Sequence, residues 1–503
     1  MMKPMRNIAL TAAAFLAIAA GGCIEDDFTT SSSDLLEFSV DTLAFDTVFT
    51  GEGTPTMQFI VYNRHSKQIN ISSIAVAGES GATFYLNVDG VKGETFSDVE
   101  IRGKDSIYVF VEAYIDYTND INPIEFVDHI NFLTNGVTQQ VALTAWGIDV
   151  TRLSAPQISQ DTRYTADRPY LIYDTLRVDS GATLTIDPGT TLYFHDKAAM
   201  VIDGTLIVNG TQDAPVNLRG DRLDEVLTGV SYDIMSGQWG GVTFTASSFG
   251  NEMRYTYMRG STDGVVADSC NVERRKLYLL NTILHNAVNS VITSSHAWIE
   301  AEGCEFSDAG GSVVKLTGGK ARLVNCTIAN YYLFSTISGT MLNLSYVFDE
   351  DSNGTDPLMD ASFDNCIFYG NATDFNIGRF PDADVMVRYC LLKSDGYDDD
   401  NFISCVWAGD PNFYTERESY IFDYRLRDES DAIGMGNAEY ISEEGMTDFY
   451  GSKRVHSDGT VDIGAYAWNS SEESDDDDDD DDDDGGGGGM GFDDGDPADE
   501  DEE

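Results

Sequence analysis

The chain has 503 residues and a formal net charge of −56, which arises from 86 acidic and 30 basic side chains. Hydrophobic residues make up 42% of it, enough to build the cores of two or three domains. The acidity argues against nucleic acid as a partner, because nucleic acid phosphates require Lys and Arg. It also argues against electrostatic docking on anionic lipids.

The first residues have the pattern of an export signal. Lys3 and Arg6 precede an apolar stretch over residues 8–20 that is too short to span a bilayer comfortably. Small residues then lead to Cys23, and this arrangement resembles a bacterial lipobox, in which the cysteine becomes lipidated. The acidic residues directly after Cys23 resemble the surface-export signal of Bacteroidota lipoproteins.

The resemblance implies a lipoprotein signal peptide over residues 1–22 and an acyl chain on Cys23 as the one membrane attachment. It implies an outer membrane location in which the protein faces the cell exterior. An ordinary cleaved secretory peptide with an incidental cysteine is the alternative.

The segment before residue 150 has the pattern of a small β domain. Residues 23–35 are polar and rich in Ser and Thr, as in a tether. Between residues 36 and 150, seven short alternating segments predict the strands of an antiparallel β-sandwich. Their order resembles the immunoglobulin-like modules of bacterial surface proteins, which implies a spacer or docking role. The segments are 43–48, 57–63, 69–74, 84–88, 106–111, 128–132 and 140–145.

After an expected linker over residues 151–169, a short phrase recurs through the second half of the chain. Aligned on one Cys or Thr column, its copies stand at positions 256, 282, 304, 326, 366 and 390, separated by 26, 22, 22, 40 and 24 residues. Repeats of about 20–25 residues with short apolar strand phrases predict a solenoid. Their strand-like alternation predicts a parallel β-helix.

Strand phrases in segments 181–190, 204–211 and 239–244 adjoin Gly, Asn or Asp, residues that tolerate the positive φ of sharp turns. They resemble the opening coils of right-handed parallel β-helix proteins with the pectin-lyase-like fold, and segment 461–466 resembles their closing segment. The expected fold class is all-β, with an antiparallel β-sandwich and then a right-handed parallel β-helix over residues 170–468.

Two residue types recur at matched positions of the repeat, and we expect both to be structural. The cysteines share one column, where parallel Cβ vectors do not suit a disulfide, so they are predicted to be reduced and buried. The asparagines are predicted to form a ladder that satisfies backbone groups of the turns. The residues are Cys304, Cys326, Cys366, Cys390, Asn281, Asn325 and Asn365.

The 40-residue spacing between Cys326 and Cys366 leaves room for an insertion over one coil, at residues 331–360. It carries aromatic and acidic side chains and lengthens a regular repeat, as binding loops on rigid scaffolds do. The candidate ligand-binding residues are Tyr331, Tyr332, Asp349, Glu350 and Asp351.

No acid/base pair, metal-ligand spacing or nucleotide-binding motif can be assigned, and His195, His285 and His296 stand isolated. Catalytic residues, metal ligands and cofactors are therefore unassigned. The favoured function is a non-catalytic cell-surface lipoprotein that binds glycan or another surface macromolecule along a flank of the β-helix. The alternative is a polysaccharide lyase or glycoside hydrolase of the pectin-lyase-like fold, whose active site would be assembled from several coils.

The chain closes with a low-complexity segment over residues 469–503. It contains ten consecutive Asp at 475–484 and five Gly at 485–489, a composition that predicts a disordered tail. Carboxylate oxygens suit Ca²⁺, but without a preorganised cage they would bind it only weakly.

Overall fold

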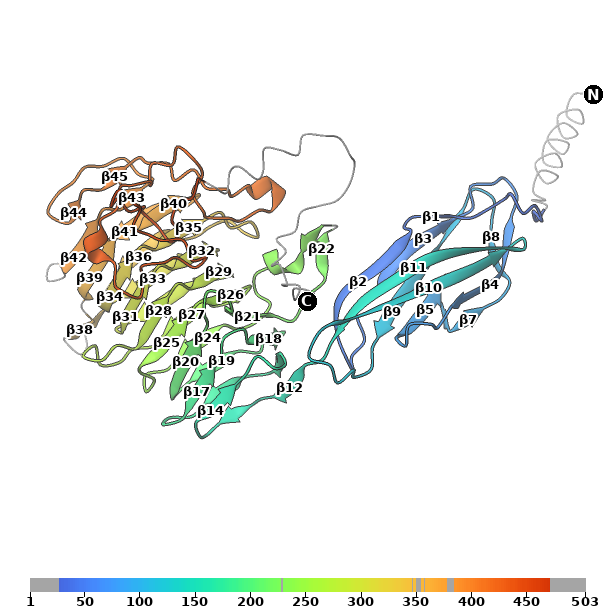
Figure 1. Cartoon of the computed structure of the whole chain (residues 1–503), viewed down its shortest axis with the longest axis horizontal. Helices are drawn as coiled ribbons and strands as arrows, with labels where there is room; N and C mark the ends of the chain where they lie inside the picture. The colour runs from blue at the N-terminus through green and yellow to red at the C-terminus, as the bar shows by residue number, and fades with distance from the viewer. Residues whose placement is uncertain are drawn as a thin grey trace, which may run out of the picture. The chain divides into compact units, whose positions relative to one another are not determined.

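The computed structural model describes residues 27–227, 229–345, 347–349, 354–356, 358–377 and 384–470. The predicted signal peptide, the lipidation candidate Cys23 and the tail from residue 471 lie outside the described residues. The chain divides into two compact units, Met1–Asp149 and Val150–Glu503 (Figure 1).

The first unit is a β-sandwich of two sheets. One sheet has the order β1-β3-β9-β5-β6, and the other has the order β2-β11-β10-β4-β7 with β8 beside β4. Alternate side chains of the long strands are buried, because successive residues of a strand face opposite sides. The strands are β1 (Glu37–Phe38), β2 (Thr42–Phe49), β3 (Met57–Tyr62), β4 (Ile69–Val76), β5 (Thr83–Val88), β6 (Val91–Gly93), β7 (Thr95–Phe96), β8 (Val99–Ile101), β9 (Ser106–Tyr114), β10 (Ile124–Thr134) and β11 (Val137–Ile148).

The seven predicted strands coincide with β2, β3, β4, β5, β9, β10 and β11. Two details differ from the prediction. Strand β2 pairs with β11 in parallel. The expected tether is docked from Asp27 onward, because the backbones of Asp27 and Thr29 hydrogen-bond to Gln68 at 3.2 and 2.9 Å.

The second unit is a parallel β-helix whose strands build three parallel sheets, called A, B and C here, with eleven, nine and ten strands in the described residues. The chain visits the sheets in the order A, B, C, and each of the first nine coils adds one strand to each sheet (Figure 1). Sheet A contains β12 (Thr151–Ser154), β15 (Tyr170–Tyr173), β18 (Thr191–His195), β21 (Val216–Gly220), β26 (Thr256–Arg259), β29 (Ile283–Ala287), β32 (Glu305–Ala309), β35 (Thr327–Asn330), β40 (Ile367–Gly370), β43 (Leu391–Leu392) and β45 (Val406–Trp407).

Sheets B and C are built in the same way, from parallel strands that pair with the equivalent strands of neighbouring coils. Sheet B contains β13 (Gln157–Ile158), β16 (Leu176–Val178), β19 (Met200–Ile202), β24 (Val242–Phe244), β27 (Val265–Ala267), β30 (Ile292–Ser295), β33 (Val314–Thr317), β36 (Thr340–Ser345) and β41 (Thr373–Ile377). Sheet C contains β14 (Thr162–Tyr164), β17 (Thr183–Ile186), β20 (Thr205–Asn209), β25 (Asn251–Arg254), β28 (Leu277–Leu280), β31 (Trp298–Glu302), β34 (Gly319–Val324), β39 (Leu358–Asp364), β42 (Asp384–Arg388) and β44 (Phe402–Ile403).

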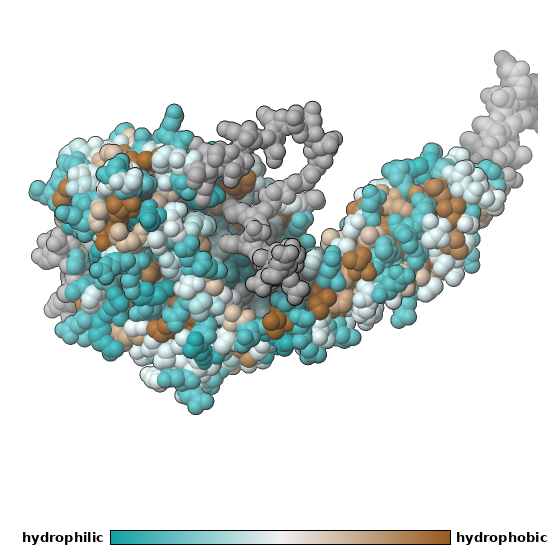
Figure 2. Space-filling model, viewed as in Figure 1, coloured by the Kyte–Doolittle hydropathy of each residue, from teal (hydrophilic) through white to brown (hydrophobic). Residues whose placement is uncertain are grey.

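Inward side chains stack from coil to coil into one continuous hydrophobic core. Because the strands are in register, equivalent positions of neighbouring coils lie directly above one another. Hydrophilic residues predominate on the face drawn in Figure 2, with hydrophobic residues scattered among them. One inward row of sheet A consists of Leu192, Leu218, Met258, Leu284, Phe306, Ile328 and Phe368.

Three expected boundaries need correction. The predicted linker at 151–169 forms the first coil, which was missed because its strands have only four, two and three residues. The expected insertion at 331–360 is two separate connections, residues 331–339 before β36 and a hairpin of β37 (Val347–Asp349) and β38 (Gly354–Asp356) after it. Residues 409–468, the C-terminal segment, leave the coils and pack on the outer face of sheet A.

Smaller elements lie outside the three sheets. The excursion between β21 and β24 holds β22 (Glu225–Leu227), β23 (Val230–Ser231) and the 3-10 helix η1 (Tyr232–Ile234). The C-terminal segment holds the 3-10 helices η2 (Arg417–Ser419) and η3 (Ala438–Tyr440).

Candidate functional site

From β28 onward, each coil turns from sheet C to sheet A in two residues, and Tyr255 alone separates β25 from β26. The first residue of every such turn has a positive φ, between 40° and 67°. Only Gly and, less readily, Asn adopt this conformation at low cost, which explains why Asn or Gly recurs there in the sequence. The turn residues are Tyr255, Asn281, Gly303, Asn325, Asn365, Tyr389 and Ser404.

The second turn residue points into the core, and it is the cysteine column of the sequence. Cys304, Cys326, Cys366 and Cys390 are free and completely buried. Each thiol donates to the backbone carbonyl two residues earlier, at 3.3 Å. Cys405 continues the column before β45, although its spacing of 15 residues from Cys390 hid it in the sequence.

The asparagines contact the C-terminal segment as well as one another. Asn365 Nδ2 donates to Asn325 Oδ1 at 3.0 Å, which is one rung of the predicted ladder. The same amide group donates to the carbonyl of Asn437 at 2.9 Å, and Asn281 Nδ2 donates to the carbonyl of Thr447 at 3.0 Å. The turns therefore form docking positions for the C-terminal segment, a role that a local repeat pattern could not reveal.

Beneath this segment, strands β29 and β32 carry a cluster of buried polar side chains. Glu305 and Asp308 are 6% and 2% exposed. Ser307 Oγ lies 2.6 Å from Glu305 Oε1 and 2.8 Å from His285 Nδ1. His285 Nδ1 also lies 3.4 Å from Asp308 Oδ2. The positive φ of Asp308, 60°, breaks the alternation of β32, so its carboxyl group can contact the outward-facing His285.

Two tyrosines of the C-terminal segment close the cluster. The Tyr466 hydroxyl donates to Glu305 Oε2 at 2.5 Å, and the Tyr424 hydroxyl donates to Asp308 Oδ2 at 2.7 Å. Both tyrosines are buried in the hydrophobic cluster between the segment and sheet A. Each carboxyl group is thus held by a residue more than a hundred positions away.

Burial shifts the protonation of all three titratable side chains. It raises the pKa of Glu305 to about 7, against the opposing hydrogen bonds from Ser307 and Tyr466. It raises the pKa of Asp308 to about 6 and, with repulsion from Arg259, lowers the pKa of His285 to about 4. A carboxyl group that titrates near neutral pH can act as a general acid or base where a substrate reaches it.

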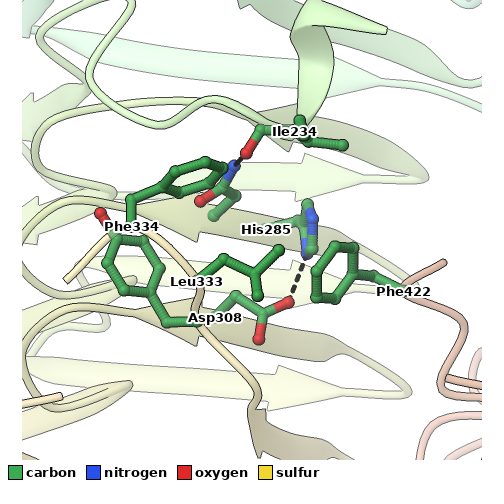
Figure 3. Close-up of a pocket in the computed structure, with 8 residues that line it drawn as sticks. Ile234, His285, Asp308, Leu333, Phe334 and Phe422 are labelled. Atoms are coloured by element: carbon green, nitrogen blue, oxygen red, sulfur yellow. Dashed lines mark hydrogen bonds and ion pairs between the residues drawn. The ribbon is translucent and has the colours of Figure 1, made fainter. Parts of the chain in front are cut away.

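Substrate does not reach this cluster in the structure. Figure 3 shows the small pocket beside it, enclosed by Ile234, His285, Asp308, Leu333, Phe334 and Phe422. The pocket has room for about one water molecule, far less than a sugar ring requires. Phe422 of the C-terminal segment lies against His285, with ring centroids 5.9 Å apart. The acidic cluster is closed by the chain's own C-terminal segment.

The structure separates the predicted ligand-binding residues. Tyr332 is only 4% exposed, its hydroxyl lies 2.7 Å from Ser236 Oγ, and it therefore faces the excursion before β24 rather than solvent. Tyr331 packs against Tyr424, with ring centroids 6.1 Å apart. Asp349 lies in β37, on the other side of β36 from both tyrosines. Glu350 and Asp351 lie outside the described residues.

Sheet B presents a different outer face. Register aligns Thr243, Val266, Thr293, Lys315 and Asn343 in one outward row across five coils. The ammonium group of exposed Lys315 has no carboxylate partner among the described residues. The connection 331–339 enters β36 at one side of this row and the β37–β38 hairpin leaves it at the other. The row thus carries four polar side chains and Val266, and its one positive charge has no carboxylate partner in the part of the chain that the structure describes.

Sequence reasoning missed Glu305 and Asp308 as candidate residues, and it treated His285 as isolated. One signal was available for Glu305. Its register partners on neighbouring coils are Ile283 and Thr327, so a carboxylate in that row departs from the repeat. Nothing local connects it to Tyr466.

Within the described ranges, no group of three or more His, Cys, Asp or Glu side chains could hold a metal ion. The same residues contain no helix that is long and apolar enough to cross a membrane.

No protein-family model and no curated protein sequence matches the chain. Among solved structures, the chain is similar to a family 123 glycoside hydrolase from Clostridium perfringens, with 8% sequence identity and a TM-score of 0.17. The similarity covers 24% of this chain and 26% of that enzyme, so the chain spans about a quarter of the enzyme's length. A likeness at this level carries no functional inference.

Proposed function

We propose that this chain is a lipid-anchored cell-surface protein that binds a glycan along the outer face of sheet B without converting it. The observation that carries the proposal is the outward row of Thr243, Thr293, Lys315 and Asn343. Hydroxyl, amide and ammonium groups are the partners that sugar hydroxyls require, and their presence on four of five successive coils, with Val266 on the fifth, suits an extended ligand.

The other two flanks offer less to a ligand. Sheet A is covered by the C-terminal segment over the coils that contain the acidic cluster. On sheet C, several charges are paired within the protein, as in Glu300 with Arg275 at 2.5 Å and Arg388 with Asp364 at 2.6 Å, and the Lys320 ammonium lies over the Trp298 ring. Such pairs satisfy their own hydrogen-bonding capacity, so sheet B is the flank we assign to the ligand.

The binding test compares two lysines. The full chain is passed over immobilised neutral and acidic polysaccharides, and the double variant Lys315→Ala/Asn343→Ala is compared with Lys320→Ala. Lys320 lies on sheet C, 5.6 Å from the Trp298 ring centroid, and serves as the matched control. Loss of two hydrogen bonds predicts affinity lower by roughly 10-fold or more in the double variant alone. Equal binding by all three proteins contradicts the assignment.

The membrane anchor rests on the sequence around Cys23 and has its own test. Cys23→Ala should release the protein from the outer membrane fraction or block its processing, and surface proteolysis of whole cells should degrade the unaltered protein. An unchanged membrane fraction for the variant contradicts lipidation.

A second candidate function is glycoside hydrolysis or lyase chemistry, because Glu305 has a pKa of about 7 and lies beside Asp308. It requires displacement of the C-terminal segment from sheet A. Reducing-end and unsaturated-product assays on the same polysaccharides decide between the two. Turnover that is abolished by Glu305→Gln would replace binding with catalysis as the function.

A further inference from the structure

Two arginines lie side by side on the outer face of sheet A, in the two coils that precede the acidic cluster, and Arg259 is the register neighbour of His285. Leu218 of β21 pairs with Met258 of β26, so the residues that follow them, Arg219 and Arg259, occupy equivalent outward positions on neighbouring coils. Adjacent strands are about 4.8 Å apart, and like charges at such positions repel each other.

One carboxylate bridges the two arginines. Asp233 of η1 lies 2.6 Å from Arg219 Nη2 through Oδ1 and accepts from Arg259 Nε at 2.9 Å through Oδ2. Two guanidinium groups and one carboxylate leave the trio with a net charge of +1. The neighbouring Arg222 does not share this excess, because Asp224 binds it at 2.5 Å.

The excess charge is shielded from water. The Arg219 and Arg259 side chains are 13% and 8% exposed, and Asp233 is 26% exposed. Burial and repulsion from Arg259 lower the pKa of Arg219. Buried charges are normally compensated, so a net positive charge at this depth indicates that an anionic partner is missing.

The hydrogen-bonding capacity of the pair is also incompletely used. Arg219 Nε is buried and has no hydrogen-bond partner among the described residues. Arg219 Nη2 donates to the carbonyl of Arg222 at 3.0 Å, and Arg259 Nη1 donates to Asn217 Oδ1 at 3.2 Å. A buried donor without an acceptor is costly, and a carboxylate or sulfate supplies the acceptors that a guanidinium group binds in pairs.

Aromatic rings border the arginines. The Arg219 guanidinium lies 5.8 Å from the Tyr193 ring centroid, and the Arg259 guanidinium lies 4.3 Å from that of Tyr257. Tyr193 is buried and Tyr257 packs against the hydrophobic cluster of the C-terminal segment, so the rings fix the positions of the two guanidinium groups.

We propose that Arg219 and Arg259 bind the carboxylate or sulfate group of an acidic sugar, with Asp233 and the flanking tyrosines shaping the site. The inference rests on the proposed function only in assigning the anion to a glycan, and it adds a separate anion-binding site on sheet A, apart from the outward row of sheet B. Asp233 limits the site to a single anionic group, since it neutralises one of the two positive charges.

The test uses the full chain and three tetrasaccharides: sulfated chondroitin, unsulfated chondroitin and neutral chitotetraose. Calorimetric titrations compare the unaltered protein with Arg219→Gln, Arg219→Lys and the control Arg222→Gln. Arg222 lies three residues after Arg219, just beyond β21, and its side chain pairs with Asp224, so its substitution removes a charge and leaves the side-chain contacts of the trio in place. We expect both acidic probes to bind the unaltered protein and Arg222→Gln more tightly than the neutral probe. Binding should fall by 10-fold or more in Arg219→Gln.

The remaining outcomes are also decisive. Arg219→Lys should retain part of the affinity, because it keeps the charge and loses paired donation; this variant decides the matter if Arg219→Gln fails to fold. Binding of the sulfated probe alone assigns sulfate as the anion. Equal affinity for acidic and neutral probes, or binding unaffected by either Arg219 substitution, overturns the proposal. Failure of the proposed function is separate, because it would appear as neutral-glycan binding that survives the Lys315/Asn343 substitutions.

Discussion

Sheets A and B belong to the same coils and share one core, yet their outer faces differ completely. On sheet A the C-terminal segment buries Glu305 and Asp308 beneath tyrosine hydroxyls. On sheet B the equivalent outward positions hold Thr293, Lys315 and Asn343, with Lys315 exposed to solvent. The inward positions maintain the solenoid, and the outward positions are free to diverge between flanks.

An acidic side chain is therefore expected to behave differently on the two flanks. Beneath the C-terminal segment, a buried carboxyl group binds a tyrosine hydroxyl of that segment, and its protonation state affects the stability of the fold. On an open flank it would remain charged and solvated. Four substitutions or conditions test this contrast, from the largest expected effect on stability to the smallest.

Sheets A and B share one buried core, and Cys326→Asp tests whether the cysteine column belongs to it. Cys326 is completely buried in the inward column, so the variant places a carboxylate there without a partner. We expect a loss of several kcal/mol in the free energy of unfolding, measured by urea denaturation. Cys326→Ala, which removes only packing, should lose about 1–2 kcal/mol. Similar losses for the two variants would show that the column is not buried as described.

The pH dependence of stability tests the fastening role of Glu305. Its pKa is raised from 4.5 to about 7 in the folded chain. The folded state therefore binds this proton more tightly than the unfolded state, so the stabilisation is complete below about pH 4.5 and is lost as pH rises through about 7. The shift corresponds to roughly 3 kcal/mol.

Unfolding measured between pH 4 and pH 8 should show this decline, and Glu305→Gln should remove most of it. A Glu305→Gln profile parallel to that of the unaltered protein would contradict the assignment. Asp308, whose pKa is raised to about 6, leaves a smaller decline over a lower pH range.

Asn365 tests how the C-terminal segment is held on the turns. Asn365→Gly preserves the positive φ of 53° and removes the amide that contacts Asn437. We expect it to cost about 1–2 kcal/mol and to raise hydrogen exchange in residues 409–468. Asn365→Ala should cost about 1 kcal/mol more, because alanine is strained at this φ. Unchanged exchange in Asn365→Gly would mean that the amide does not hold the segment.

Much of the fold was accessible from the sequence because its determinants are local. The seven alternating segments of the sandwich and the Cys and Asn columns each follow from period-two burial or from the φ of one turn residue. The sites were not accessible, because Glu305 meets Tyr466 and Asp308 meets Tyr424 only after the C-terminal segment returns over sheet A. Tyr332 misled the prediction for the same reason, since its partner Ser236 precedes it by 96 residues.

Lys315→Ala has the smallest expected effect on stability, and it tests directly whether the outer face of sheet B serves binding instead of folding. Lys315 is exposed and has no carboxylate partner in the described part of the chain, so its removal should alter the free energy of unfolding by no more than about 0.5 kcal/mol. The same substitution should weaken glycan binding, because the ammonium group is the one positive charge of the outward row. Arg388→Ala on sheet C provides the opposite control, since it leaves the buried Asp364 carboxylate, now 2.6 Å from Arg388 Nε, without its partner. That variant should lose stability and retain binding. If Lys315→Ala instead destabilises the chain and leaves binding intact, sheet B is a structural flank and the ligand must be sought elsewhere.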